Sequence, residues 1–245
     1  MYETKYHKAS SLDSAASTLG GADDGKFLSG GMTLIPTMKQ RLAAPSDLVD
    51  IGGLSELQGI SKNGNTLTIG AGTTHADVAS SSDVQSAIPA LAALASHIGD
   101  PHVRNRGTLG GSIANNDPAA DYPAAVLALG ATIKTNSREI AAGDFFAGMF
   151  ETSLNEDEII VSVSFPIPEK AGYAKFPNPA SRYAMAGVFA AKTADGPRVS
   201  VTGAGQDGVY RESAMEAALG SDWSPASASS VDVSADDLMS DIHGS

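Results

Sequence analysis

The sequence contains no cysteine. A chain without thiols forms no disulfide, ligates no zinc through thiolate and holds no iron-sulfur cluster of its own. Its five histidines also lack the short spacings that metal-binding pairs share, and they are His7, His75, His97, His102 and His243. We therefore expect no metal site in this chain, and any such centre would have to lie on another subunit.

Basic residues are also scarce, with 16 Lys and Arg against 28 Asp and Glu, which gives a formal net charge of -12. Such a field repels nucleic-acid phosphates and anionic membrane surfaces, so nucleic acid is not an expected partner. No apolar run approaches the roughly 18 residues of a membrane span, and residues 1–11 lack the features of a secretory signal. We expect a cytoplasmic protein.

The chain is long enough for one large domain or two modest ones, at 245 residues and 42% hydrophobic content. Between residues 166 and 179 it becomes rich in proline, as is typical of a linker or a domain edge. We therefore expect two domains that meet at this stretch. Residues 100–121 hold few apolar side chains but many Gly, Asn, Asp and Arg, a composition that favours a binding segment or an interface.

Apolar spacing and turn residues predict alternating helices and strands. Strands are expected over residues 1–7, 26–28, 48–51, 57–60, 67–71, 131–134, 159–165, 186–192 and 199–203. Helices are expected over residues 12–19 after a Ser11 cap, 34–42, a short segment after Thr74, 83–98, 123–129 and 213–219. After Trp223 no further strong amphipathic element is expected.

Two glycine-rich segments, residues 28–35 and 107–112, are the main indication of function. Each has a pair of glycines beside hydroxyl residues. A pyrophosphate needs several converging N–H donors without side chains in the way, which glycine allows, and the helix after the first segment would add its N-terminus. Two such turns could hold the two phosphates of a dinucleotide. Ordinary tight turns are the alternative, because neither segment matches a Rossmann fingerprint or a P-loop.

These segments also resemble those of a known family. The run SGGMTLIPTMKQRLA leading to LVDI, and the longer run IGDPHVRNRGTLGGS leading to NDPAADYP, are similar to the FAD-binding medium subunit of aerobic carbon-monoxide dehydrogenases and related molybdenum hydroxylases of the xanthine dehydrogenase family. The similarity runs in the same order from the N-terminus to about Leu219. The second run is the more specific of the two.

The resemblance implies an α+β fold. Residues 1–170 would form an FAD-binding domain of the vanillyl-alcohol oxidase (PCMH) type, with lobes at about 1–55 and 56–170. Residues 178–245 would form a small α+β domain like the C-terminal domain of carbon monoxide dehydrogenase flavoproteins. Relatives usually continue past the equivalent of residues 240–245 into a further helix. Its absence would leave apolar surface exposed or covered by a neighbouring subunit.

Carried over position by position, the resemblance implies a cofactor site without a catalytic residue of its own. Its residues would be Leu28, Ser29, Gly30, Gly31, Met32, Thr33, Leu34, Ile35, Ile98, Thr108, Leu109, Gly110, Gly111, Ser112, Asp121, Ile160, Lys175 and Tyr183. The two glycine segments would hold the pyrophosphate through backbone N–H groups and hydroxyls, and Asp121 would accept hydrogen bonds from cofactor hydroxyls. Ile98 and Ile160 would pack against the cofactor. Lys175 and Tyr183 would lie near the isoalloxazine ring.

Other interpretations of these residues remain open. Asp121 could instead cap the helix that begins near Pro123, and Lys175 and Tyr183 could be surface residues beside the domain boundary. Arg104 and Arg106 could neutralise phosphate or could be charges of a solvated loop or a subunit interface. Met32 replaces the His or Gln that is frequent in the family, so a polar contact to the flavin would be missing or replaced by an apolar one.

The implied function is electron transfer within a complex. A large subunit would hold the molybdenum cofactor, a small subunit would hold 2Fe-2S clusters, and FAD on this chain would pass electrons to an external acceptor, in a dimer of heterotrimers. The absence of cysteine fits this division. Two alternatives are a free-standing flavin oxidoreductase of the same fold and a non-catalytic protein for ligand binding or assembly. Neither the substrate nor the acceptor follows from the sequence.

Overall fold

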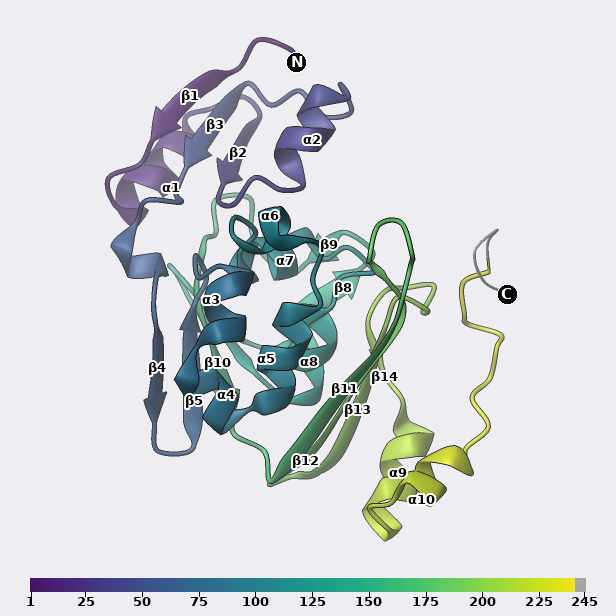
Figure 1. Ribbon diagram of the computed structural model, residues 1–245. Coiled ribbons are helices and arrows are strands. Elements are labelled where there is room, and N and C mark those ends of the chain that lie inside the picture. The colour runs from purple at the N-terminus through teal and green to yellow at the C-terminus, as the bar shows by residue number, and fades with distance from the viewer. Residues whose placement is uncertain (241–245) are drawn as a thin grey trace.

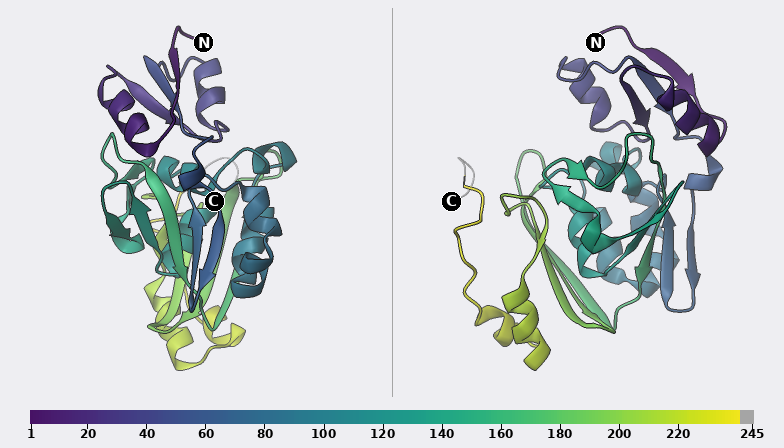
Figure 2. Two further views of the ribbon diagram at one scale, coloured as in Figure 1. Left: turned by 90° about the vertical axis from the view of Figure 1, so that its left-hand side faces the viewer. Right: turned by 180° about the vertical axis from the view of Figure 1, so that it is seen from behind.

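The computed structural model describes residues 1–240, so His243 and the last residues of the expected C-terminal domain lie outside the described part. The chain forms an N-terminal lobe, a central lobe and a C-terminal sheet; in Figure 1 the N-terminal lobe lies at the top and the C-terminal sheet lies beside the central lobe. Figure 2 shows that the first and last helices lie at opposite ends of the molecule. No helix within residues 1–240 is long and apolar enough to cross a membrane.

The N-terminal lobe is a small parallel sheet, in the order β1-β3-β2, flanked by two helices. Its elements are β1 (Lys5–Lys8), α1 (Leu12–Gly20), β2 (Gly25–Leu28), α2 (Leu34–Lys39) and β3 (Asp47–Asp50). The predicted Ser11 cap is confirmed, because its side chain accepts from the backbone N–H of Ser14. Helix α2 ends earlier than predicted, since Arg41 adopts a left-handed backbone conformation with φ 63°. Leu42 is consequently exposed.

The central lobe is an antiparallel sheet, in the order β4-β5-β10-β6-β7, with helices on one face (Figure 1). Its elements are η1 (Ser55–Leu57), β4 (Ile60–Asn63), β5 (Thr66–Gly70), α3 (His75–Ser80), α4 (Ser82–Ala87), α5 (Pro89–Ser96), α6 (Pro101–Arg104), α7 (Leu109–Asn115), α8 (Tyr122–Ala128), β6 (Thr132–Thr135), β7 (Glu139–Ala141), η2 (Ala142–Asp144), β8 (Phe146–Gly148), β9 (Glu151–Thr152) and β10 (Ile160–Pro166).

Two predicted elements of this lobe are wrong in detail. Of the strand expected over residues 57–60, Leu57 ends η1, residues 58 and 59 connect the two elements, and β4 begins only at Ile60. The helix expected over residues 83–98 is two helices, because Pro89 has no N–H to continue α4 and instead begins α5.

Strand β10 also departs from simple alternation. Its pairing with β6 shifts between Ile160 and Ser162, as at a bulge, and a bulge changes the side to which the following residues point. Ile159 and Val161 therefore pack in the cluster with Leu54 and Leu57 that supports the N-terminal lobe. Ile160, together with Val163 and Phe165, belongs to the main core instead.

The C-terminal sheet is antiparallel and packs on the helices of the central lobe (Figure 1). Its elements are β11 (Lys170–Pro177), β12 (Ala184–Thr193), β13 (Gly196–Thr202), β14 (Tyr210–Arg211), α9 (Ser213–Ser221) and α10 (Pro225–Ser229). Helices α5 and α8 lie between the two large sheets, and Phe189 and Ala191 of β12 join the core cluster of the central lobe. The C-terminal sheet thus shares one core with the lobe before it.

The proline-rich stretch is not a linker in this structure. Residues 170–177 form β11, the edge strand of the C-terminal sheet, with Pro177 at its end. Proline is tolerated at a strand end on a sheet edge, because no ladder hydrogen bond is lost there. The C-terminal sheet therefore begins eight residues before the predicted position 178, whereas the division of the chain into domains stays a prediction.

Helix α10 was not expected from the sequence. It is one turn capped by the side chain of Ser224, which accepts from the backbone N–H of Ser227. Beyond it the chain returns to residues 204–206, where Leu238 pairs with Gly205. Val233 and Met239 of this segment are exposed apolar side chains, as is Phe176 of β11.

Candidate functional site

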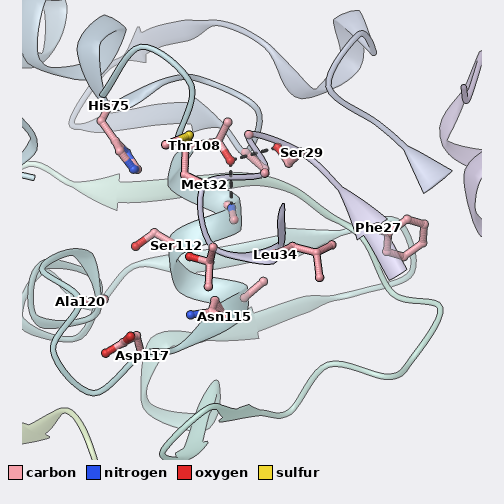
Figure 3. A pocket seen from close by; sticks show the side chains of 18 of the residues that line it. Phe27, Ser29, Met32, Leu34, His75, Thr108, Ser112, Asn115, Asp117 and Ala120 are labelled. Carbon is pink, nitrogen blue, oxygen red and sulfur yellow. Dashed lines mark hydrogen bonds between the residues drawn. The ribbon is translucent and has the colours of Figure 1, made fainter. Parts of the chain in front are cut away.

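A cavity of about 620 Å³ lies where the N-terminal lobe meets the central lobe. Residues 26–34 form its wall on the first lobe, and residues from α3, from the loops around α6, from α7 and from the start of β10 form the opposite wall. Ser181, Arg182 and Tyr183, in the loop between β11 and β12, also line it. Figure 3 shows side chains from both lobes converging on this space.

The first glycine segment lies at the contact between the lobes. A Cβ at Gly30 would overlap the backbone carbonyl of Arg106 and would come within 2.9 Å of the Cα of Gly107, so only glycine fits there. Gly31 has a φ of +71°, which glycine adopts without strain. The backbone N–H groups of residues 30–34 donate to no other described residue. This segment therefore offers free amides beside the cavity, followed by the start of α2.

The second glycine segment is the first turn of helix α7 rather than a free turn. Thr108 is the N-cap, and its hydroxyl accepts from the N–H of Gly111 at 3.1 Å. The N–H of Leu109 donates to Thr73 and that of Gly110 donates to Ala71. Gly110 is needed because a Cβ there would lie 2.6 Å from the Cβ of Ala71.

The two segments consequently differ in the groups that they present. The amides of the first are free, whereas those of Leu109 and Gly110 in the second are already bonded within the protein. The second segment presents the hydroxyls of Thr108 and Ser112 to the cavity instead. Figure 3 shows both hydroxyls on the cavity side of α7.

The two segments are in direct contact although they are far apart in the sequence. The hydroxyls of Ser29 and Thr108 lie 3.0 Å apart and form a hydrogen bond (Figure 3). Gly30 packs on the backbone just before Thr108. The fold therefore places both predicted segments on one cavity, as a single ligand held by both would require.

Asp121 also lines the cavity, and it stands at the N-cap position of α8. It makes no side-chain capping bond to α8, so the interpretation as a cap is wrong. One of its oxygens accepts from the hydroxyl of Tyr173, and the Nζ of Lys175 lies 2.9 Å from that oxygen and 3.0 Å from the other. Burial raises the pKa of Asp121, against the opposing effect of the Lys175 charge.

Lys175 is not a surface residue. Its side chain is 3% exposed, and it also donates to the backbone carbonyl of His97 at 3.2 Å. Its charge is therefore used within the protein, and it contacts the cavity only through Asp121. Tyr183, by contrast, is 43% exposed and stands at the cavity edge.

Most of the predicted residues line the cavity, and three do not: Ile35, Leu109 and Lys175. Leu109 is fully buried in the main core. Of the two arginines considered for phosphate binding, neither lines the cavity. Arg104 donates to the backbone carbonyls of Ile98 and Gly99, at 3.1 and 3.0 Å, and so stabilises the turn before α6.

Several lining residues were not predicted. They include Leu57, Gly72, His75, Asn115, Asp117, Glu158, Ser181 and Arg182. Glu158 has a structural partner, because Arg138 and the hydroxyls of Thr135 and Ser137 bond to its carboxylate. These bonds, with that of Arg138 the largest, lower the pKa of Glu158 to about 2. Only proximity in the folded chain reveals this group of residues, since no local motif unites them.

Comparisons with known proteins agree with this geometry. Residues 2–168 match the family described as the FAD binding domain in molybdopterin dehydrogenase. The nicotine 6-hydroxylase medium subunit of Paenarthrobacter nicotinovorans is 35% identical, over 98% of this chain and 90% of its own length.

Two solved structures are similar over most of the chain. Quinoline 2-oxidoreductase from Pseudomonas putida 86 superposes with a TM-score of 0.89 at 30% identity, over 99% of this chain and 90% of that one. A carbon monoxide dehydrogenase from Hydrogenophaga pseudoflava that lacks the Mo-pyranopterin moiety of the molybdenum cofactor superposes with a TM-score of 0.82 at 37% identity, over 88% and 79%. The chain belongs to the family of FAD-binding medium subunits of molybdenum-containing hydroxylases, with the carbon-monoxide and xanthine dehydrogenases.

Proposed function

We propose that this chain transfers electrons within a molybdenum hydroxylase complex, from iron-sulfur clusters on a partner subunit to an external acceptor. The supporting observation is the contact between the two glycine segments across the hydroxyls of Ser29 and Thr108, beside a cavity with free amides. Bound FAD would supply the redox chemistry, since it can take up and release electrons. The protein would position and tune it.

The residues present fit a dinucleotide with a diphosphate bridge. Free backbone N–H groups at residues 30–34 are suitable donors to phosphate oxygens. The Ser112 hydroxyl adds a donor, and so does whichever hydroxyl of the Ser29–Thr108 pair is the acceptor in their hydrogen bond. The amide of Gly111 would become free if the Thr108 hydroxyl turned toward the ligand. The cavity volume lies within the roughly 300–1,000 Å³ common for cofactor and ligand sites.

We propose that the remaining predicted residues contact the cofactor as expected, except for Lys175. Asp121 would accept from cofactor hydroxyls with the lone pairs that Tyr173 and Lys175 leave free. Lys175 would position Asp121 rather than approach the isoalloxazine ring, because its charge is already paired. Ile98 and Ile160 would supply apolar walls, Met32 would add a polarizable one, and Tyr183 would cover the open edge.

The partners proposed are a large subunit with the molybdenum cofactor and a small subunit with 2Fe-2S clusters, as a dimer of heterotrimers in the cytoplasm. The lack of cysteine supports this division, because cluster ligands must then come from another chain. The relatives' names include a nicotine hydroxylase and a carbon monoxide dehydrogenase. Because similar chains thus belong to enzymes that act on different substrates, the substrate would be selected by another subunit of the complex. We also propose the vanillyl-alcohol oxidase type for the two FAD-binding lobes.

Purification from the source organism followed by native mass spectrometry tests this function. We expect one FAD per copy of this chain and two copurifying subunits, one with molybdenum and one with iron. The isolated chain with FAD should pass electrons from a reduced dye to an acceptor but should oxidise no organic substrate. A chain that purifies alone, with its own substrate turnover, would support a free-standing oxidoreductase, and a colourless chain that ignores added FAD would support a non-catalytic role.

A further inference from the structure

We propose that His75 is an additional ligand-binding residue of the cavity, and that it donates a hydrogen bond from Nε2–H to an acceptor atom of the bound flavin dinucleotide. This inference depends on the proposed function, because it assigns a role to a side chain of the same site. His75 was not among the residues predicted from the sequence to touch the cofactor.

The position of His75 is fixed by the segment that carries Thr108. His75 is the first residue of α3, and its backbone N–H donates to the carbonyl of Gly107 at 3.0 Å. Thr74 and Thr108 pair in an isolated bridge beside it. The imidazole is therefore held in register with the second glycine segment, and Figure 3 shows it on the wall near Met32 and Thr108.

Space for the ring is made by a glycine. A Cβ at Gly107 would lie 2.6 Å from Nε2 of His75, so any other residue would displace the imidazole. Gly107 has no positive φ that would by itself require glycine. Gly107 also packs against Gly30 of the first segment. The His75 ring and the first glycine segment are therefore both neighbours of Gly107.

The burial of the two ring nitrogens identifies the one that carries the proton. Nδ1 is fully buried and has no hydrogen-bond partner in the described structure, and the ring of Tyr122 packs against the imidazole at 5.4 Å between centroids. A buried N–H without an acceptor is costlier than an unused lone pair, so Nδ1 is left unprotonated. Nε2, the nitrogen left to face the cavity that His75 lines, then carries the hydrogen.

The donor is neutral rather than cationic. His75 is 4% exposed, and its burial, together with the nearby charge of Arg104, lowers its pKa to about 4. A neutral N–H binds a phosphate oxygen or a flavin carbonyl without the desolvation cost of an imidazolium. The site therefore keeps this contact across the whole physiological pH range.

Two substitutions by amide side chains test which ring nitrogen of His75 contacts the ligand. In His75→Gln the side-chain N–H₂ reaches about as far as Nε2, whereas in His75→Asn it reaches only the position of Nδ1. The full-length chain, stripped of FAD, would be titrated with FAD by flavin fluorescence. We expect His75→Gln to bind within about threefold of wild type and His75→Asn to bind roughly tenfold more weakly, the effect of about one lost hydrogen bond. His102→Asn, an exposed histidine outside the cavity, is the matched control.

Titration with ADP identifies the acceptor. If His75 contacts the diphosphate, His75→Asn weakens ADP in the same proportion as FAD. If it contacts the ring system, ADP binding is unchanged and the visible absorption bands of bound FAD shift instead. Equal FAD affinity for the Asn and Gln variants would overturn the assignment. Failure of the wild-type chain to bind FAD would instead refute the proposed function.

Discussion

Replacement of Lys175 by Met tests the buried pair beneath the cavity. Lys175 and Asp121 are 3% and 4% exposed in their side chains, and Met keeps the length of the Lys side chain while removing its charge. Asp121 would then be a buried carboxylate with only the Tyr173 hydroxyl as a donor. Breaking a buried ion pair in this way typically destabilises a protein by about 3–5 kcal/mol.

Protonation of Asp121 limits the loss of stability in Lys175→Met. A carboxyl with an ordinary pKa of 3.8 can be kept neutral at pH 7 for about 1.4 kcal/mol per unit, or about 4 kcal/mol in all. Loss of the Lys175 charge should raise the pKa of Asp121 further. A carboxyl whose pKa is higher in the folded chain than in the unfolded chain destabilises the fold at every pH above the unfolded pKa. The penalty should therefore be greatest at neutral pH and shrink toward pH 4.

Thermal unfolding of the full chain measures this effect. For a chain of this size a loss of 3–4 kcal/mol corresponds to a fall in Tm of roughly 6–16 °C at pH 7. The double variant Lys175→Met/Asp121→Asn, with no buried charge, should recover most of the loss. Lys170→Met, at the exposed start of the same strand, is the matched control. A fall of less than about 2 °C in Lys175→Met, or no recovery in the double variant, would refute the assigned role of the pair.

Three further predictions follow from named contacts. Gly30→Ala places a methyl group on the Arg106 carbonyl and should weaken FAD binding roughly tenfold to a hundredfold in a fluorescence titration. Gly20→Ala, with open space around its Cβ, is the control and should leave the FAD titration curve unchanged. Glu158→Gln should lower the free energy of unfolding in urea by about 2 kcal/mol at pH 7, a value reduced to allow for the exposure of Arg138. The difference from wild type should vanish as the pH falls from 4.5 to about 2, and a difference that stays constant would contradict the pairing. His75 has a folded pKa of about 4 against 6.5 unfolded, so wild-type stability should rise by about 3 kcal/mol from pH 4 to 6.5, and His75→Gln should lack that slope in acid unfolding.

The sequence was most informative where the physics is local. The Ser11 cap and the Thr74 cap each depend on neighbours within four residues, and each helix begins where it was predicted. Pro89 is a local feature too, and it should have divided the helix predicted over residues 83–98.

Long-range contacts account for what the sequence did not reveal. The amides of Leu109 and Gly110 are occupied by Thr73 and Ala71, a fact that depends on how β5 and α7 dock. The shifted register of β10 depends on β6, and the pairing of Lys175 depends on Asp121, 54 residues earlier. His75 has no motif of its own, because its role arises from the space left by Gly107.

The phosphorus NMR spectrum of the full chain saturated with FAD tests the central claim most directly. If the free amides of the first segment and the hydroxyls of the second hold one diphosphate, both phosphorus resonances should move from their positions in free FAD. In Gly30→Ala they should return toward those positions. Bound flavin whose phosphorus resonances match those of free FAD would contradict the account.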